Sequence, residues 1–209
     1  MDRKKLLEEL ESFASPYDFV IKRLLNDIPW IFHADQTSYT KWRIEASKAS
    51  DINADYIYLV GSAATGFSLN PLKAGQDFRP LKTSESWPSD IDIAIVDPGL
   101  FESAWNTILS YDRTLRMREV IVKESKERPF KDRLARLRLD IYWGTLSSTF
   151  TISGTEEARR IRALLAATTR LSPFQGYQTR ARIYRRREDL ISYHIQSMKR
   201  LLDNLKEEG

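Results

Sequence analysis

The segment Ser89–Pro98, with the sequence SDIDIAIVDP, decides the expected fold. Five of its residues are apolar, four of them consecutive, which is typical of a buried β-strand. Asp90 and Asp92 stand at its start. Because strand side chains alternate between faces, we expect both carboxylates on one side, about 6.5–7 Å apart, with the isoleucines facing the core. Two like charges on one face repel each other unless a cation lies between them, so the segment predicts a site for a divalent ion such as Mg²⁺.

A second feature lies upstream, in residues 55–66 (DYIYLVGSAATG). The apolar run predicts a strand that ends at Gly61-Ser62. Glycine lets a backbone approach a phosphate closely, Ser62 supplies a hydroxyl donor, and a helix start would add free N–H groups. A Gly-Ser pair is common, but one at a strand end followed by Asp-x-Asp on the next strand is far rarer. The combination predicts a turn that binds a triphosphate.

A third acid occurs in residues 135–144, ARLRLDIYWG. The alternation of apolar and polar residues predicts a strand, with Asp140 on its polar face beside Arg136 and Arg138. If this strand neighbours the other two, Asp140 converges with the aspartates at 90 and 92. Three carboxylates could then hold two Mg²⁺ ions, which clamp the attacking and leaving oxygens of a displacement at phosphorus. The alternative is an ion pair between Asp140 and one of the two arginines.

These three motifs together resemble the nucleotidyltransferase superfamily of DNA polymerase beta type, over residues 55–143. The resemblance implies an α/β palm: a mixed β-sheet flanked by helices, with N-terminal helices and a C-terminal helix in a single domain, 1–209. It implies transfer of a nucleoside monophosphate from a nucleoside triphosphate (NTP), dependent on two Mg²⁺ or Mn²⁺ ions. By position, Gly61 and Ser62 would hold the triphosphate, Asp90 and Asp92 would bridge the metals, and Asp140 would complete the metal site. One departure is the segment of 27 residues between Ser62 and Asp90, which is longer than is usual in the family.

The remaining pattern predicts further helices and one further strand. Apolar spacing and end signals predict helices at 2–14, after Pro16, at 37–50, at 100–112, from a capping box at Ser153–Glu156 to about Thr169, and at 186–207. The alternating stretch TRARIYR, from Thr179, predicts the strand. We expect a helical part at 1–50, the palm at 55–143 and a basic part at 151–209.

Positive charge is concentrated at the C-terminal end. Residues 151–209 carry 12 Lys and Arg against 7 Asp and Glu, and the whole chain has a net charge of +4. Arg180 and Arg182 share a strand face and could bind a triphosphate or an oligonucleotide backbone, or they could be solvated. Tyr193 could stack on a base or pack in the core. We expect His194, between apolar residues at helical spacing, to be a hydrogen-bonded core residue.

The segment 69–89 holds three prolines and few periodic apolar positions, so we expect a long loop. Its aromatic residues Phe78 and Trp87 and its cations Lys73, Arg79 and Lys82 are unusual for a plain linker. We predict that the loop closes over bound nucleotide or docks a protein partner.

Composition excludes several classes of protein. The chain has no cysteine, which rules out disulfides and thiolate sites, and no apolar run long enough to span a membrane. We expect a cytoplasmic protein. Three functions stay open: synthesis of a small nucleotide or oligonucleotide signal, as in bacterial anti-phage defence; nucleotidyl transfer to a protein or a tRNA; and a non-catalytic nucleotide-binding module.

Overall fold

The computed structural model describes residues 3–70, 73, 75–81, 87–112 and 130–207. Four strands form one sheet in the order β1-β2-β4-β3. They are β1 (Ile57–Val60), β2 (Ile91–Val96), β3 (Thr145–Ser147) and β4 (Thr179–Tyr184). β1 is antiparallel to β2, β2 is parallel to β4, and β3 is antiparallel to β4. The predicted α/β class with a mixed sheet is confirmed.

Helices surround this sheet, and each predicted helix is present, with small differences at the ends. The α-helices are α1 (Arg3–Glu11), α2 (Pro16–Phe19), α3 (Gln36–Ser50), α4 (Ser62–Thr65), α5 (Pro98–Asp112), α7 (Phe130–Tyr142), α8 (Glu156–Arg170) and α9 (Arg187–Glu207). A π-helix, η1 (Val20–Asn26), continues α2, and short 3₁₀ turns are η2 (Trp30–Phe32), η3 (Ala54–Tyr56) and η5 (Ser148–Phe150). Within the described parts of the chain, no helix is both long and apolar enough to cross a membrane.

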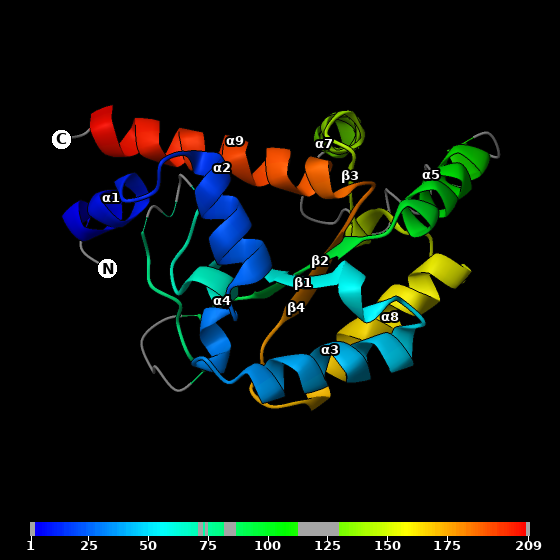
Figure 1. Cartoon of the computed structure of the whole chain (residues 1–209). Coiled ribbons are helices and arrows are strands. Elements are labelled where there is room, and N and C mark those ends of the chain that lie inside the picture. The colour runs from blue at the N-terminus through cyan, green and yellow to red at the C-terminus, as the bar shows by residue number, and fades with distance from the viewer. Residues whose placement is uncertain (1–2, 71–72, 74, 82–86, 113–129, 208–209) are drawn as a thin grey trace.

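Each face of the sheet packs on its own group of helices (Figure 1). The face that carries Ile91, Ile93 and Ile95 is buried under α3, α5 and α8, as expected for the core side of β2. The opposite face packs on α9, α1 and η1, and Ala94 and Val96 of β2 are buried there. The aspartate side of β2 is therefore also a core face, and it is polar only at the start of the strand.

The start of α8 differs slightly from the prediction. Thr155, not Ser153, is the N-cap, and its hydroxyl accepts a hydrogen bond from the backbone N–H of Ala158. Both residues suit a helix start, but the cap must lie directly before the first helical residue, Glu156. The predicted capping box is therefore wrong, because the residue three after the N-cap is Ala158 and not an acid.

The predicted strand at 135–144 is wrong, because this stretch lies mostly in helix α7. Leu137 is buried, but Leu139 is 59% exposed, so the apolar residues do not share one strand face. The segment also fits helical spacing, since apolar residues stand at 130, 134, 137 and 141. Its arginines, leucines and alanine favour a helix, which outweighs a short alternation. Gly144, with φ +63°, follows the helix and leads into β3.

The loop at 69–89 is anchored to the fold by its described residues. Phe78 is 5% exposed and packs against Trp30 and Tyr177, so it is a core residue rather than a contact for a ligand. Gly75 lies against Leu6 of α1. Trp87, in contrast, is 89% exposed. Lys82 lies outside the described residues, as do the rest of 82–86 and residues 71, 72 and 74, so the predicted closure and partner docking stay predictions.

Candidate functional site

The strand register brings the predicted motifs to one edge of the sheet. β1 runs antiparallel to β2, so its last residue, Val60, pairs with Asp92 near the start of β2. β4 runs parallel to β2, and Arg180 near its start also pairs with Asp92. The Gly61-Ser62 turn, the two aspartates and Arg180 therefore meet although they are far apart in sequence. The sequence predicted that a strand at 135–144 would lie beside β2. The strand that lies there is β4, which carries arginines instead of a third acid.

Gly61 and Asp92 are in close contact at this edge. Gly61 has φ +66° and ψ −154°, a backbone region that is essentially restricted to glycine. A Cβ at this position would lie 2.9 Å from Oδ2 of Asp92. The glycine is therefore required by both the turn and the approach of the carboxylate.

A cleft of about 600 Å³ opens at this edge. Gly61, Ser62, Asp90, Asp92 and Arg180 all line it, so five of the predicted site residues are brought together. The other lining residues come from the anchored loop and from helices, and they are Ser68, Leu69, Asn70, Lys73, Gln76, Asp77, Arg79, Pro88, Ser89, Arg136, Tyr193, His194, Ser197 and Arg200. The volume lies within the range of small-molecule sites, which is roughly 300–1,000 Å³.

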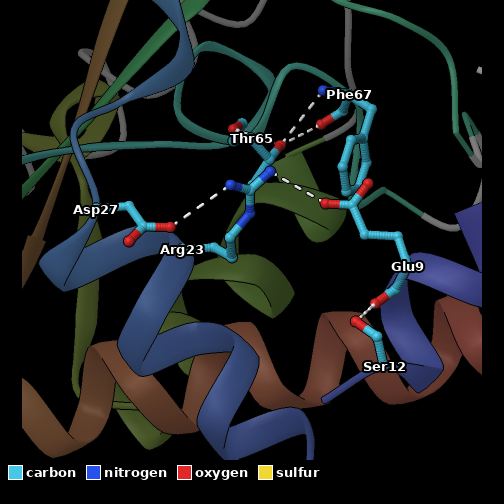
Figure 2. A network of polar contacts seen from close by, with 7 residues as sticks. Glu9, Ser12, Arg23, Asp27, Thr65 and Phe67 are labelled. Carbon is cyan, nitrogen blue, oxygen red and sulfur yellow. Dashed lines mark hydrogen bonds and ion pairs between the residues drawn. The ribbon is translucent and has the colours of Figure 1, made fainter. Parts of the chain in front are cut away.

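The far side of the turn is held by buried hydrogen bonds. The Thr65 hydroxyl lies 2.6 Å from the carbonyl oxygen of Phe67 and 3.2 Å from that of Gly61. Figure 2 shows Thr65 with Phe67, and also Arg23 ion-paired with Glu9 and Asp27 at 3.0 and 3.5 Å. Arg23 thereby links η1 to α1. The Thr65 hydrogen bonds hold the backbone that presents Gly61 and Ser62 to the cleft.

Negative charge at the start of β2 is only partly compensated. Burial, and then the charge of Asp90, raise the pKa of Asp92 to about 6, against the opposing effects of Arg180, Arg182 and Lys73. The Asp90 carboxylate is ion-paired with Arg180, with Oδ2 3.1 Å from Nη2. Burial favours the protonated form of Asp92, whereas the like charge of Asp90 is the part of the shift that a bound cation would relieve.

The two carboxylates fit a divalent ion of the hard, oxygen-binding type. Mg²⁺ is commonly held by one or two carboxylates, with water and substrate phosphates filling its other positions. Asp90 and Asp92 supply that donor set in a cleft with room for phosphates. Among the residues that the structure describes, no three acidic or histidine side chains are grouped so as to hold a metal by themselves.

Asp140 does not join the other two aspartates in the cleft lining. Its carboxylate accepts a 2.8 Å hydrogen bond from Nη1 of Arg182, which also donates to Thr145 at 3.0 Å. The Arg182 guanidinium lies 4.9 Å from the ring centre of Tyr193. Asp140 thus links α7 to β4 through Arg182, which also contacts β3 and α9. Asp140 is ion-paired, as in the alternative from the sequence, but its partner is Arg182 rather than Arg136 or Arg138.

Replacement of Asp140 distinguishes a role as a metal ligand from a role as the ion-pair partner of Arg182. We expect Asp140→Asn to lower the free energy of unfolding by about 1–3 kcal/mol, because it leaves the half-buried Arg182 without a charged partner. Turnover per folded molecule should fall less than tenfold. Denaturant unfolding and steady-state kinetics on the same preparation measure both quantities. A thousandfold loss of turnover at unchanged stability would instead make Asp140 a catalytic ligand.

His194 is buried as predicted, with 7% of its surface exposed, but it is not hydrogen-bonded as expected. Its Nε2 atom is buried and has no hydrogen-bond partner in the structure. Burial, with a contribution from the charge of Arg182, lowers the pKa of His194 to about 4. The neutral ring packs against Tyr184 and Tyr193. Protonation of this residue is therefore costly in the folded state.

The pH dependence of stability follows from that shift. The unfolded chain takes up a proton at His194 near pH 6.5, whereas the folded chain does so only near pH 4. Stability from this group is therefore complete above pH 6.5, and about 3 kcal/mol is lost as the pH falls to 4. We expect His194→Gln to lack this loss, as seen in the difference between the two unfolding curves from pH 7.5 to 4. Parallel curves for the two proteins would contradict the burial of a neutral ring.

Sequence reasoning missed several residues that the fold brings to the cleft. Arg136 of α7 was assigned to a strand, and Ser197 and Arg200 of α9 were not considered. A usable signal was present, because Tyr193, Ser197 and Arg200 follow the i, i+4, i+7 spacing of one helical face. All three line the cleft. Tyr193 also has a ring face against Arg182, which accounts for its packing role.

Comparison with known proteins leaves the site to be interpreted from its own residues. No family model, curated protein sequence or solved structure matches this chain.

Proposed function

We propose that the protein is a metal-dependent nucleotidyltransferase that transfers a nucleoside monophosphate from an NTP to a hydroxyl acceptor. The observation that carries the proposal is the meeting of the Gly61-Ser62 turn with Asp90, Asp92 and Arg180 in one cleft. A phosphate-compatible turn, paired carboxylates and an arginine are the groups that this chemistry needs. Its product would be a small nucleotide or oligonucleotide signal, of the kind used in bacterial anti-phage defence.

Each residue has a role in the proposed reaction. The acceptor hydroxyl releases its proton to solvent and its oxygen bonds to the α-phosphorus, the bond from that atom to the α–β bridging oxygen breaks, and pyrophosphate leaves. Asp90 and Asp92 would hold the Mg²⁺ or Mn²⁺, which supplies charge neutralisation at the transferring phosphoryl group. Ser62 donates to the triphosphate. Arg180, which is ion-paired with Asp90 in the structure, would leave that carboxylate and pair with phosphate oxygens, which a guanidinium binds well.

A direct assay tests the proposal. The purified protein is incubated with Mg²⁺ or Mn²⁺ and each α-³²P-labelled NTP or dNTP, with and without total tRNA or cell protein. We expect small labelled products together with pyrophosphate. Label on tRNA or protein would support transfer to a macromolecule instead. Tight nucleotide binding without any product would indicate a non-catalytic module and would contradict the proposal.

A single hydroxyl tests the placement of the triphosphate. Ser62→Ala should weaken NTP binding by about 1–3 kcal/mol, since a hydrogen bond to a charged group is lost. Titration calorimetry with a non-hydrolysable NTP measures this change. The matched control is Ser110→Ala, on α5 outside the cleft lining, which should leave affinity unchanged. Equal affinities for Ser62→Ala and the unmodified protein would mean that Ser62 does not bind the triphosphate and that the Gly-Ser turn only ends a strand.

A further inference from the structure

The cleft contains more positive charge than its acidic residues balance. Its lining includes five cationic side chains, Lys73, Arg79, Arg136, Arg180 and Arg200, and three acidic ones, Asp77, Asp90 and Asp92. Clefts lined by one sign of charge concentrate ligands of the opposite sign. The excess therefore indicates an anionic ligand, and the positions of the cations show where its charges would lie.

Two of these cations are already engaged near the strand edge. Arg180 is ion-paired with Asp90, and the charge of Lys73 acts on Asp92. Arg180 is assigned above to the donor nucleotide, and Lys73 acts on the same aspartate edge. They therefore partly compensate the charge of the aspartates.

Arg136 and Arg200 differ from these two cations in origin and environment. They belong to α7 and α9, the helices that also meet at the Arg182 ion pair, rather than to the strand ends. Both are exposed, and neither has a carboxylate partner within the described parts of the chain. Ser197, one turn before Arg200, lines the same cleft. One cleft is thus lined by two exposed guanidinium groups and a hydroxyl. Such a lining is suited to phosphate, because a guanidinium binds phosphate through two parallel N–H donors.

We propose that Arg136 and Arg200 form a second phosphate site, which binds a phosphate group of the acceptor. This inference rests on the proposed function and extends it, because it makes the acceptor a nucleotide or the end of an oligonucleotide. A protein hydroxyl as acceptor would leave both arginines without a counter-charge. The two sources of the phosphate, a mononucleotide and a nucleic acid strand, share the recognised group and are distinguished by experiment.

Binding without catalysis provides the test. The double variant Arg136→Gln/Arg200→Gln is compared with a matched control, Arg162→Gln/Arg170→Gln. The control removes the same charge from exposed positions of α8, on the opposite face of the sheet. Anisotropy of a fluorescent single-stranded oligoribonucleotide is measured without divalent ions over a series of salt concentrations, and AMP binding is measured by calorimetry. Melting curves establish that both variants are folded.

We expect the cleft variant to bind the oligoribonucleotide at least tenfold more weakly, while the control changes less than twofold. The slope of log affinity against log salt should fall by about 0.7, since each neutralised phosphate of a single strand contributes about 0.7. Loss of AMP binding as well identifies the mononucleotide phosphate as sufficient, whereas loss for the strand alone identifies a nucleic acid acceptor. Equal binding by the cleft variant and the control overturns the proposal, as does an acidic peptide that competes as well as the oligoribonucleotide.

Donor binding separates this inference from the proposed function. The affinity for a non-hydrolysable NTP should change less than threefold in the cleft variant, because the donor lies at the strand ends. An equal loss for donor and oligoribonucleotide would assign both arginines to the donor and overturn the second site. If the unmodified protein binds phosphate through these arginines but forms no product from any NTP, the second site stands and the proposed function fails.

Discussion

The double variant Asp90→Asn/Asp92→Asn is expected to lose nucleotidyl transfer by at least about a thousandfold. Both carboxylates line the cleft at the start of β2, and no neighbouring strand supplies a replacement, because β4 presents arginines there. Asparagine keeps the shape of each side chain but removes the charge that a divalent ion requires. Turnover of labelled NTP, with Mg²⁺ and with Mn²⁺, measures the loss.

The stability of the single variant Asp92→Asn provides a second measurement. The raised pKa of Asp92 means that folding disfavours its ionised form, so this group lowers stability as the pH rises from about 4 to about 6. Above pH 6 the single variant Asp92→Asn should therefore melt no lower than the unmodified protein. An unfolded or strongly destabilised Asp92→Asn protein would support a structural role for the carboxylate.

A matched control distinguishes the site from a general effect of charge. Asp203 lies on α9, is exposed and does not line the cleft. Asp203→Asn should keep its turnover and its melting temperature. If the Asp90/Asp92 double variant also keeps its turnover, the protein is not an enzyme of the proposed type.

The sequence predicted the edge of the sheet well because two short-range rules apply there. Strand alternation placed Asp90 and Asp92 opposite the core isoleucines, and a glycine at a strand end indicated a sharp turn. Neither rule needs knowledge of distant contacts. The gathering of Gly61, Ser62, Asp90, Asp92 and Arg180 depends on strand order, which the resemblance supplied and the sequence alone did not.

Asp140 shows where the local pattern was insufficient. Leu137, Leu139 and Ile141 fit a strand when taken alone, and only the longer stretch from 130 reveals helical spacing. The neighbouring strand turned out to be β4, which is 39 residues downstream of Asp140 at its first residue, Thr179. No property of residues 135–144 predicts that β4 pairs with β2. The contact between Asp140 and Arg182 is likewise a product of tertiary packing.

The basic residues of the cleft were hidden for a related reason. Arg136 and Arg200 are ordinary solvent-facing residues in their own helices. The counts of charged residues showed an excess of positive charge only for the C-terminal part as a whole. Only the tertiary packing of α9 and α7 brings them to the lining of the cleft. Helix periodicity identified the buried side of α9 but could not say which strand end its polar side would meet.

Gly61→Ala is expected to reduce both stability and transfer. The backbone of Gly61, at φ +66° and ψ −154°, costs other residues of the order of 1–3 kcal/mol. The added methyl group would also lie 2.9 Å from Oδ2 of Asp92, so the carboxylate or the turn must move. A shift of about 1 Å in a catalytic group can cost about a hundredfold in rate, and we expect a loss of that size in transfer. Denaturant unfolding and single-turnover transfer measure the two effects.

Gly154→Ala separates the two causes, since Gly154 has φ +90° but a Cβ there would meet no atom within 4 Å. That variant carries backbone strain without a steric contact, and it lies outside the cleft lining. We therefore expect it to lose stability and keep its turnover, whereas Gly61→Ala loses both. Two variants with the same turnover would mean that the contact between Gly61 and Asp92 does not position the carboxylate. Loss of transfer only in Gly61→Ala would tie catalysis to the placement of Asp92 by the turn.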